Sequence, residues 1–159
     1  MAVTSPPAAA VEGLCPAELD AWRGMLRVHA SVLKALDAEL EAAHGLPLTS
    51  YEVLIQLADA PEHKMRMCDL ADSVLLSRSG MSRLVDRLER DGLLCRAACT
   101  NDARGAFACI TQAGLDLLDK ARPTHVAGIR HRFLAQFDED ELRLLGALWE
   151  RVAPTTASF

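Results

Sequence analysis

Residues 67–111 read MCDLADSVLLSRSGMSRLVDRLERDGLLCRAACTNDARGAFACIT, and this stretch decides the fold. Two amphipathic helices are predicted in it, Cys68–Leu75 and Ser77–Asp91, followed by a hairpin with strands Leu93–Ala98 and Ala106–Ile110. In the second helix the apolar residues recur at spacings of three, four and seven, which gathers them on one stripe. They are Met81, Leu84, Val85 and Leu88. A helix pair that leads into a hairpin is typical of a winged helix-turn-helix.

The opposite face of the second helix is polar and rich in arginine. At about 100° per residue, it carries Ser79, Ser82, Arg83, Asp86, Arg87 and Arg90. A recognition helix contacts base edges from its N-terminal half, which predicts base contacts for Arg78, Ser79, Ser82 and Arg83. Arg87 and Arg90 lie further along and are predicted to contact phosphates. A solvated charged face on an ordinary surface helix is the alternative, and the hairpin that follows favours DNA.

Charge distribution qualifies this prediction. The chain has 159 residues, half of them hydrophobic and a quarter charged, with a net charge of −5. Between Glu62 and Arg104, eight Lys or Arg face seven acidic residues, so this segment is slightly positive while the rest of the chain is acidic. Binding to DNA would therefore depend on a few placed arginines more than on a broad positive field.

The remaining chain is predicted to be helical. Helices are expected over about Pro16–Ala43 and Thr49–Ala60, with a short extended piece at Lys64–Met67. A long helix follows the cap residue Thr111 and bends at Pro123, and a last helix begins at Asp138, where Glu141 completes a capping box. The fold class is therefore mainly α with a small β-hairpin wing (α+β).

The terminal helices carry more leucine than a core of this size needs. The last helix is expected to turn one apolar side inward, formed by Leu142, Leu145, Leu148, Trp149 and Val152. This surplus predicts that the chain pairs with a second copy through its helices.

At the level of motifs, the sequence resembles the MarR family of bacterial transcriptional regulators. The resemblance rests on CDLA at residues 68–71, LSRSGMSRLVDRLERDGL at 76–93, Asp102-Ala103-Arg104, and ITQAG at 110–114, and it covers about residues 19–153. It implies one MarR-like domain at 16–153, between a disordered lead at 1–15 and a tail at 154–159. Dimerisation helices are expected at about 16–44 and 111–153, and the winged helix-turn-helix at about 48–110.

The resemblance further implies a homodimer on a palindromic operator in double-stranded DNA, acting as a repressor. The equivalent of Arg104 enters or lines the minor groove, and the acid at Asp102 orients it by an ion pair. A tight turn held by these two residues is the alternative. A small aromatic or phenolic effector is expected between the dimer helices and the DNA-binding lobe, with Trp22, His29 and Tyr51 as candidate contacts. The competing interpretation makes His29 a core histidine and Tyr51 a packing residue.

Five cysteines suggest a second kind of regulation. Cys15 lies where related peroxide sensors carry a reactive thiol, although the tyrosines that hold that thiolate are missing here. Cys95, Cys99 and Cys109 belong to the wing strands, so their oxidation would distort the wing. The alternative is that they are small apolar side chains packed inside the hairpin.

Other classes of function find little support. His125 and His131 lie six residues apart, about 240° around a helix, so they do not converge with Cys95 and Cys99 on a zinc ion. No metal, cofactor or enzymatic activity is predicted, because phosphate-binding loops and nucleophile motifs are missing from the sequence. No signal peptide or membrane span is predicted, which favours the cytoplasm and, when bound to DNA, the nucleoid. The alternative function is a winged-helix protein-interaction module without DNA binding.

Overall fold

The computed structural model describes residues 13–74, 77–98 and 106–154. Six α-helices and three strands are described, together with two short 3-10 turns, η1 (Pro61–His63) and η2 (Leu134–Gln136). The helices are α1 (Pro16–His44), α2 (Leu48–Asp59), α3 (Met67–Ser73), α4 (Arg78–Arg90), α5 (Gln112–Arg132) and α6 (Glu139–Val152). The strands are β1 (Lys64–Arg66), β2 (Leu94–Ala98) and β3 (Ala106–Ile110). The predicted fold class is confirmed.

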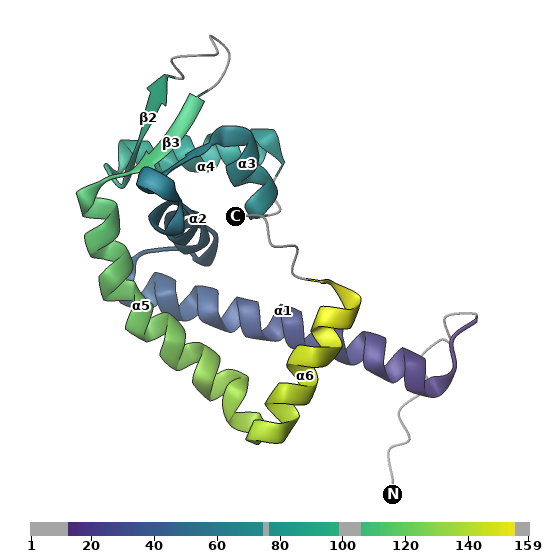
Figure 1. The fold of residues 1–159 in the computed structure, drawn as a ribbon. Coiled ribbons are helices and arrows are strands. Elements are labelled where there is room, and N and C mark those ends of the chain that lie inside the picture. The colour runs from purple at the N-terminus through teal and green to yellow at the C-terminus, as the bar shows by residue number, and fades with distance from the viewer. Residues whose placement is uncertain (1–12, 75–76, 99–105, 155–159) are drawn as a thin grey trace, which may run out of the picture.

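The molecule has two halves (Figure 1). The upper half of this view holds α2, α3, α4 and the sheet, and the lower half holds α1, α6 and most of α5. Helix α5 joins them, because it begins at the end of β3 and then packs along α1. It continues through Pro123 and bends along its length, as predicted.

The three strands form one antiparallel sheet in the order β1-β3-β2. Strand β3 therefore lies in the centre, with Lys64 opposite Cys109 on one side and Cys95 opposite Cys109 on the other. Leu94, Ala108 and Ile110 turn one face of the sheet toward the core. That core also contains the predicted apolar stripe of α4 and side chains of α1, α2, α3 and α5.

An ion pair, a hydrogen bond and close packing hold α5 against α1. The Arg132 guanidinium forms an ion pair with Glu39, and His44 Nε2 lies 2.8 Å from Thr124 Oγ1. Gly128 is buried, and a Cβ there would overlap Leu36 and Glu39, so the missing side chain lets the two helices approach closely.

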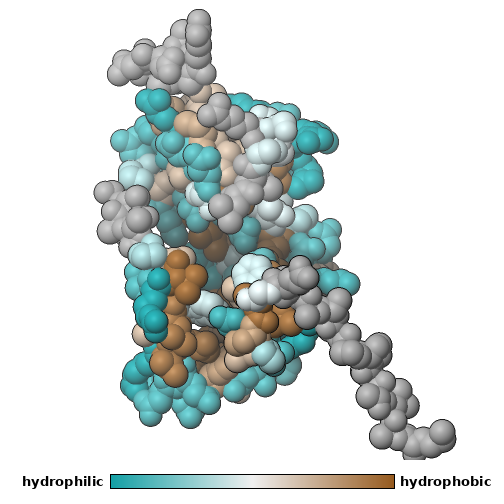
Figure 2. All heavy atoms as spheres, turned by 90° about the vertical axis from the view of Figure 1, so that its right-hand side faces the viewer, coloured by the Kyte–Doolittle hydropathy of each residue, from teal (hydrophilic) through white to brown (hydrophobic). Residues whose placement is uncertain are grey.

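Helix α6 begins as predicted, since Asp138 accepts from the Glu141 N–H and Glu141 Oε2 accepts from the Asp138 N–H, both at 2.9 Å. The expected burial of its apolar side does not occur within one chain, where α6 has no buried residue. Figure 2 views the side on which α6 and the N-terminal part of α1 lie, and it shows apolar side chains gathered in the lower half. The large exposed apolar residues of these two helices include Trp22, Leu26, Val28, Leu144, Leu148, Trp149 and Val152.

No helix in the described ranges combines the length and the apolar character that a membrane span requires.

Candidate nucleic-acid interface

Helix α4 presents the face that the sequence predicts. Its N-cap is Ser77, whose hydroxyl accepts a hydrogen bond from the Gly80 N–H at 3.1 Å. Met81, Leu84, Val85 and Leu88 are buried, which confirms the predicted stripe. The opposite side is exposed and carries Ser79, Ser82, Arg83, Asp86, Arg87 and Arg90. Arg78 opens the helix, but its side chain lies outside the described part.

Arg83 and Arg87 share a hollow with the start of α2. The hollow has a volume of about 300 Å³ and is lined by Thr49, Gly80, Arg83, Leu84 and Arg87. Arg87 Nη2 also donates to Ser50 Oγ at 3.4 Å. A helix N-terminus carries a partial positive charge. Two guanidinium groups, the Thr49 hydroxyl and this helix end together suit a phosphate oxygen, while the buried Ser50 hydroxyl holds Arg87 in place.

Thr49 and Ser50 were missed by the sequence reasoning, which treated Thr49–Ala60 only as a packing helix. The available signal was a pair of hydroxyl residues directly after Pro47, at the predicted start of that helix. Their proximity to α4 depends on tertiary packing, because Ser50 and Arg87 are 37 residues apart in the chain.

Arg96 in β2 fixes the sheet against α4. Its guanidinium binds Asp86 Oδ1 at 2.6 Å and Glu89 Oε2 at 2.5 Å, and its backbone N–H donates to Glu89 Oε1 at 3.0 Å. From the sequence alone, Arg96 was only one of the eight basic residues between Glu62 and Arg104. In the structure its guanidinium and its backbone N–H hold β2 to α4.

The outer face of the sheet carries two more cations, of which Lys64 is ion-paired with Glu62. Lys64 and Arg66 of β1 each lie with the charged group 5.8 Å from the centre of the Phe107 ring. Cation–π contacts of this kind hold the long side chains over the sheet. The predicted wing residues Asp102 and Arg104 lie outside the described residues.

The three candidate effector contacts do not come together within one chain. Trp22 and His29 are exposed on α1, so the interpretation of His29 as a core histidine is wrong. Tyr51 is fully buried in α2, with its ring centre 4.5 Å from that of His125 in α5. Trp22 lies 22 residues before His44, about 33 Å along α1, whereas Tyr51 packs near the His44 end. His125 was weighed only as a zinc ligand, because no local pattern relates it to Tyr51 and only packing brings the two rings together.

His125 is unusual among the described side chains. Its Nδ1 is buried and is the one such atom in the described ranges without a hydrogen-bond partner. Burial lowers the pKa of His125, and burial also raises the pKa of Tyr51. Burial therefore favours the neutral form of both rings at the contact of α2 with α5.

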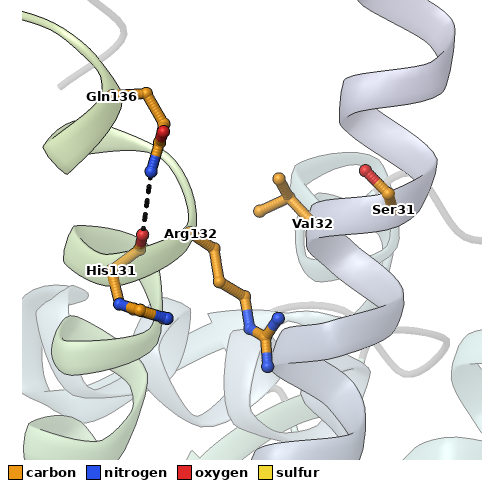
Figure 3. Close-up of a pocket in the computed structure, with 5 residues that line it drawn as sticks. All are labelled: Ser31, Val32, His131, Arg132 and Gln136. Atoms are coloured by element: carbon orange, nitrogen blue, oxygen red, sulfur yellow. Dashed lines mark hydrogen bonds between the residues drawn. The ribbon is translucent and has the colours of Figure 1, made fainter.

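A second hollow lies between α1 and the end of α5 (Figure 3). It measures about 320 Å³ and is lined by Ser31, Val32, His131, Arg132 and Gln136. The Gln136 amide donates to the His131 carbonyl at 3.4 Å, and the Arg132 side chain points toward α1. None of the candidate effector residues lines this hollow.

The cysteines fall into two groups. Cys15 is exposed at the N-cap of α1, with no tyrosine ring contact recorded for the described residues. Cys95 is exposed and Cys109 is half-buried on the outer face of the sheet, so the interpretation of Cys95 as a packed core residue is wrong. Cys99 lies outside the described residues. No group of three or more potential metal ligands occurs in the described ranges.

Comparisons with known proteins point to one family. A family model described as "MarR family" matches residues 44–105. The HTH-type transcriptional regulator MhqR of Bacillus subtilis is 31% identical over 116 residues, which cover 73% of this chain and 78% of that protein.

Two solved structures from Streptomyces coelicolor are also similar. AbsC, a MarR family transcriptional regulator, superimposes with a TM-score of 0.82 at 34% identity, covering 88% of this chain and 94% of AbsC. Sco3205, a MarR family transcriptional regulator solved in complex with DNA, has a TM-score of 0.83 at 31% identity, covering 92% of this chain and 94% of Sco3205.

Proposed function

Because the chain belongs to the MarR family of transcriptional regulators, we propose that it represses transcription as a homodimer bound to a palindromic operator. The observation that carries this proposal is the exposed face of α4, where Arg83 and Arg87 share a hollow with Thr49. In this proposal two copies of α4 enter successive major grooves, and the dimer excludes polymerase where operator and promoter overlap.

The proposed division of labour follows position along α4. Arg83 lies in the N-terminal half and is assigned to a guanine edge, with Ser79 and Ser82 beside it and Arg78 at the helix start. Arg87 and Arg90 are assigned to phosphates, because they lie in the last turn and Arg87 already contacts Ser50. Arg104 is assigned to the minor groove with Asp102 as its partner, on the resemblance alone.

Dimerisation is supported by the apolar surface that one chain leaves uncovered. Trp22 is 52% exposed, Trp149 46% and Val152 77%, although large apolar side chains are usually covered in a folded protein. We assign α1, α5 and α6 to the dimer interface, which gives α6 the partner that it lacks within one chain.

A small aromatic or phenolic effector is proposed at the contact of α2 with α5. Tyr51 and His125 supply two rings in tilted contact there, with an interplanar angle of 49°, and the buried Nδ1 of His125 offers a hydrogen bond that no described residue uses. This site joins the dimer helices to the DNA-binding half, so a ligand there would change their relative position.

The experiment is a fluorescence-anisotropy titration of DNA flanking the protein's own gene, at fixed salt, followed by footprinting. We expect specific binding and a footprint with two half-sites about one helical turn apart. Arg104→Ala should weaken binding while leaving the dimer folded. Binding no tighter than to unrelated DNA would favour the alternative, a winged-helix protein-interaction module.

A further inference from the structure

Two thiols face each other on the outer surface of the wing sheet. Cys95 in β2 and Cys109 in β3 are direct cross-strand partners. Their neighbours Leu94, Ala108 and Ile110 are buried on the inner face, so the two cysteines share the outer one. Cys95 is exposed and Cys109 half-buried, which leaves the pair accessible from solvent.

The strand register suits a disulfide. The Thr111 N–H donates to the Leu93 carbonyl at 3.1 Å, one register step beyond the pairing of Leu94 with Ile110. Hydrogen-bonded positions alternate along an antiparallel ladder, so the Cys95–Cys109 pair, two residues further, is also hydrogen-bonded, with Cα atoms about 5.5 Å apart. This separation falls at the common value for disulfides, about 5.5–6 Å.

The two thiols also interact and have a charged neighbour. Burial raises the pKa of Cys109, and a hydrogen bond between the thiols raises it further, while the Lys64 ammonium acts in the opposite direction. Lys64 is the partner of Cys109 on its other side, in β1, and its ammonium also binds Glu62. The exposed Cys95 is therefore the thiol that a reagent meets first, and Cys109 stands behind it with a cation beside it.

We propose that Cys95 and Cys109 form a hydroperoxide-reactive site, whose oxidation closes a cross-strand disulfide and weakens binding to DNA. The second half of this proposal rests on the proposed function, whereas the first half does not.

The chemistry balances with a hydroperoxide as the oxidant. Cys95 loses its proton and its thiolate attacks the terminal OH oxygen of the peroxide. The O–O bond breaks, the alkoxide or hydroxide leaves and takes up the proton that Cys95 lost, and Cys95 becomes a sulfenic acid. The Cys109 sulfur then attacks the Cys95 sulfur. Hydroxide leaves and takes the Cys109 proton as water, and Lys64 stabilises the developing Cys109 thiolate. Two thiols are oxidised by two electrons, and one peroxide bond is reduced.

Formation of the disulfide would affect the proposed DNA-binding helix α4 through Arg96. Opposed Cβ atoms in a sheet lie about 4.5–5.5 Å apart, whereas a disulfide holds them at about 3.5–4.5 Å. Oxidation therefore draws β2 toward β3 at Cys95. The next residue, Arg96, binds Asp86 and Glu89 of α4, so the shift strains the connection between wing and recognition helix. The same strands lead to residues 99–105, which contain Asp102 and Arg104.

The test treats full-length protein with cumene hydroperoxide and maps its disulfides by trypsin digestion and mass spectrometry. Cleavage after Arg90, Arg96, Arg104 and Lys120 puts Cys95, Cys99 and Cys109 on three separate peptides, DGLLCR, AACTNDAR and GAFACITQAGLDLLDK. We expect a linked DGLLCR–GAFACITQAGLDLLDK species that a dithiol reductant separates. Cys95→Ser and Cys109→Ser should abolish this species, and the matched controls Cys99→Ser and Cys68→Ser should retain it.

Operator binding is measured on the same samples before oxidation, after oxidation and after reduction. We expect oxidation to lower affinity about 5- to 150-fold, the usual size of coupling between two sites, with recovery on reduction and no change in Cys95→Ser. Melting curves of the reduced variants check that they are folded.

Either of two results would overturn the proposal: a disulfide that links other cysteines, or a Cys95–Cys109 disulfide that leaves affinity unchanged. If reduced protein binds no DNA specifically, the proposed function fails while the peptide map still decides whether the dithiol site exists.

Discussion

Arg96 and Glu89 bind each other twice, through the guanidinium Nη1 at 2.5 Å from Oε2 and through the Arg96 backbone N–H at 3.0 Å from Oε1. The pair joins β2 to the last turns of α4. Both the side chain and the backbone of one strand residue therefore bind one carboxylate, which fixes β2 relative to α4.

Replacement of Arg96 tests this connection. Arg96→Ala leaves the Asp86 and Glu89 carboxylates close together without their cation, and we expect a loss of about 1–3 kcal/mol in the free energy of unfolding, together with weaker operator binding. Urea denaturation measures the loss. Arg143→Ala is the matched control, because Arg143 also binds two carboxylates, Glu139 and Asp140, but is 65% exposed, so its loss should be below about 1 kcal/mol. Equal losses in the two variants would contradict the structural role of Arg96.

Arg83 and Arg87 should have different effects on DNA binding. Arg83→Ala is expected to cost about 1–3 kcal/mol and to relax preference at one base pair, as for a base contact. Arg87→Ala should weaken all sequences alike and flatten the dependence of log K on log salt by about one unit, as for a phosphate contact. Anisotropy titrations across several salt concentrations and single-base operator variants measure both. A sequence-dependent loss in Arg87→Ala would reverse the assignment.

Trp149 should be needed for the dimer. Trp149→Glu places a charge on the uncovered apolar side of α6, and we expect dissociation to a monomer whose melting temperature no longer depends on protein concentration. Sedimentation velocity gives the oligomeric state. Asp72→Ala, at an exposed position of α3 in the other half of the molecule, is the control and should stay dimeric. If Trp149→Glu forms a dimer with an unchanged dissociation constant, the interface does not include this side of α6.

Gly114 should not accept a side chain. It lies in the first turn of α5, where a Cβ would overlap the Leu93 carbonyl oxygen and Ile110, so Gly114→Ala is expected to destabilise the protein by about 1–3 kcal/mol. Gly24→Ala is the control, because no atom lies within 4 Å of its Cβ position in α1, and it should stabilise by about 0.5–1 kcal/mol. Thermal unfolding measures both, and a neutral Gly114→Ala would mean that the contact relaxes freely.

His125 should make stability depend on pH. Burial lowers the pKa of His125 in the folded state, so the unfolded chain, with a pKa of about 6.5, takes up a proton first as the pH falls. Its contribution to stability is therefore complete above about pH 6.5 and decreases as the pH falls through the folded pKa. Melting temperatures between about pH 8 and pH 5 should fall less in His125→Phe than in wild type. His29→Gln, at an exposed position, should follow wild type.

Local pattern was sufficient for the helices, strands and caps. The spacing of apolar residues in α4 and the cap residues Thr111 and Asp138 predicted elements that the structure contains, because helix periodicity and capping depend on neighbours within one or two turns. The arginine face of α4 follows from the same periodicity. The sequence by itself therefore determined the fold class and the side of α4 that faces outward.

Only the tertiary structure decided which distant residues meet. Arg87 reaches Ser50, Tyr51 contacts the His125 ring, and Cys95 faces Cys109, because strand register and helix packing bring together segments that no local pattern relates. Helix packing also keeps Trp22 and His29 on the exposed surface of α1, away from the buried Tyr51. Strand packing places Cys95 on the exposed face of the sheet, whereas the sequence also allowed a buried position. Residue type and spacing set what each segment can form, and packing sets what each side chain can touch.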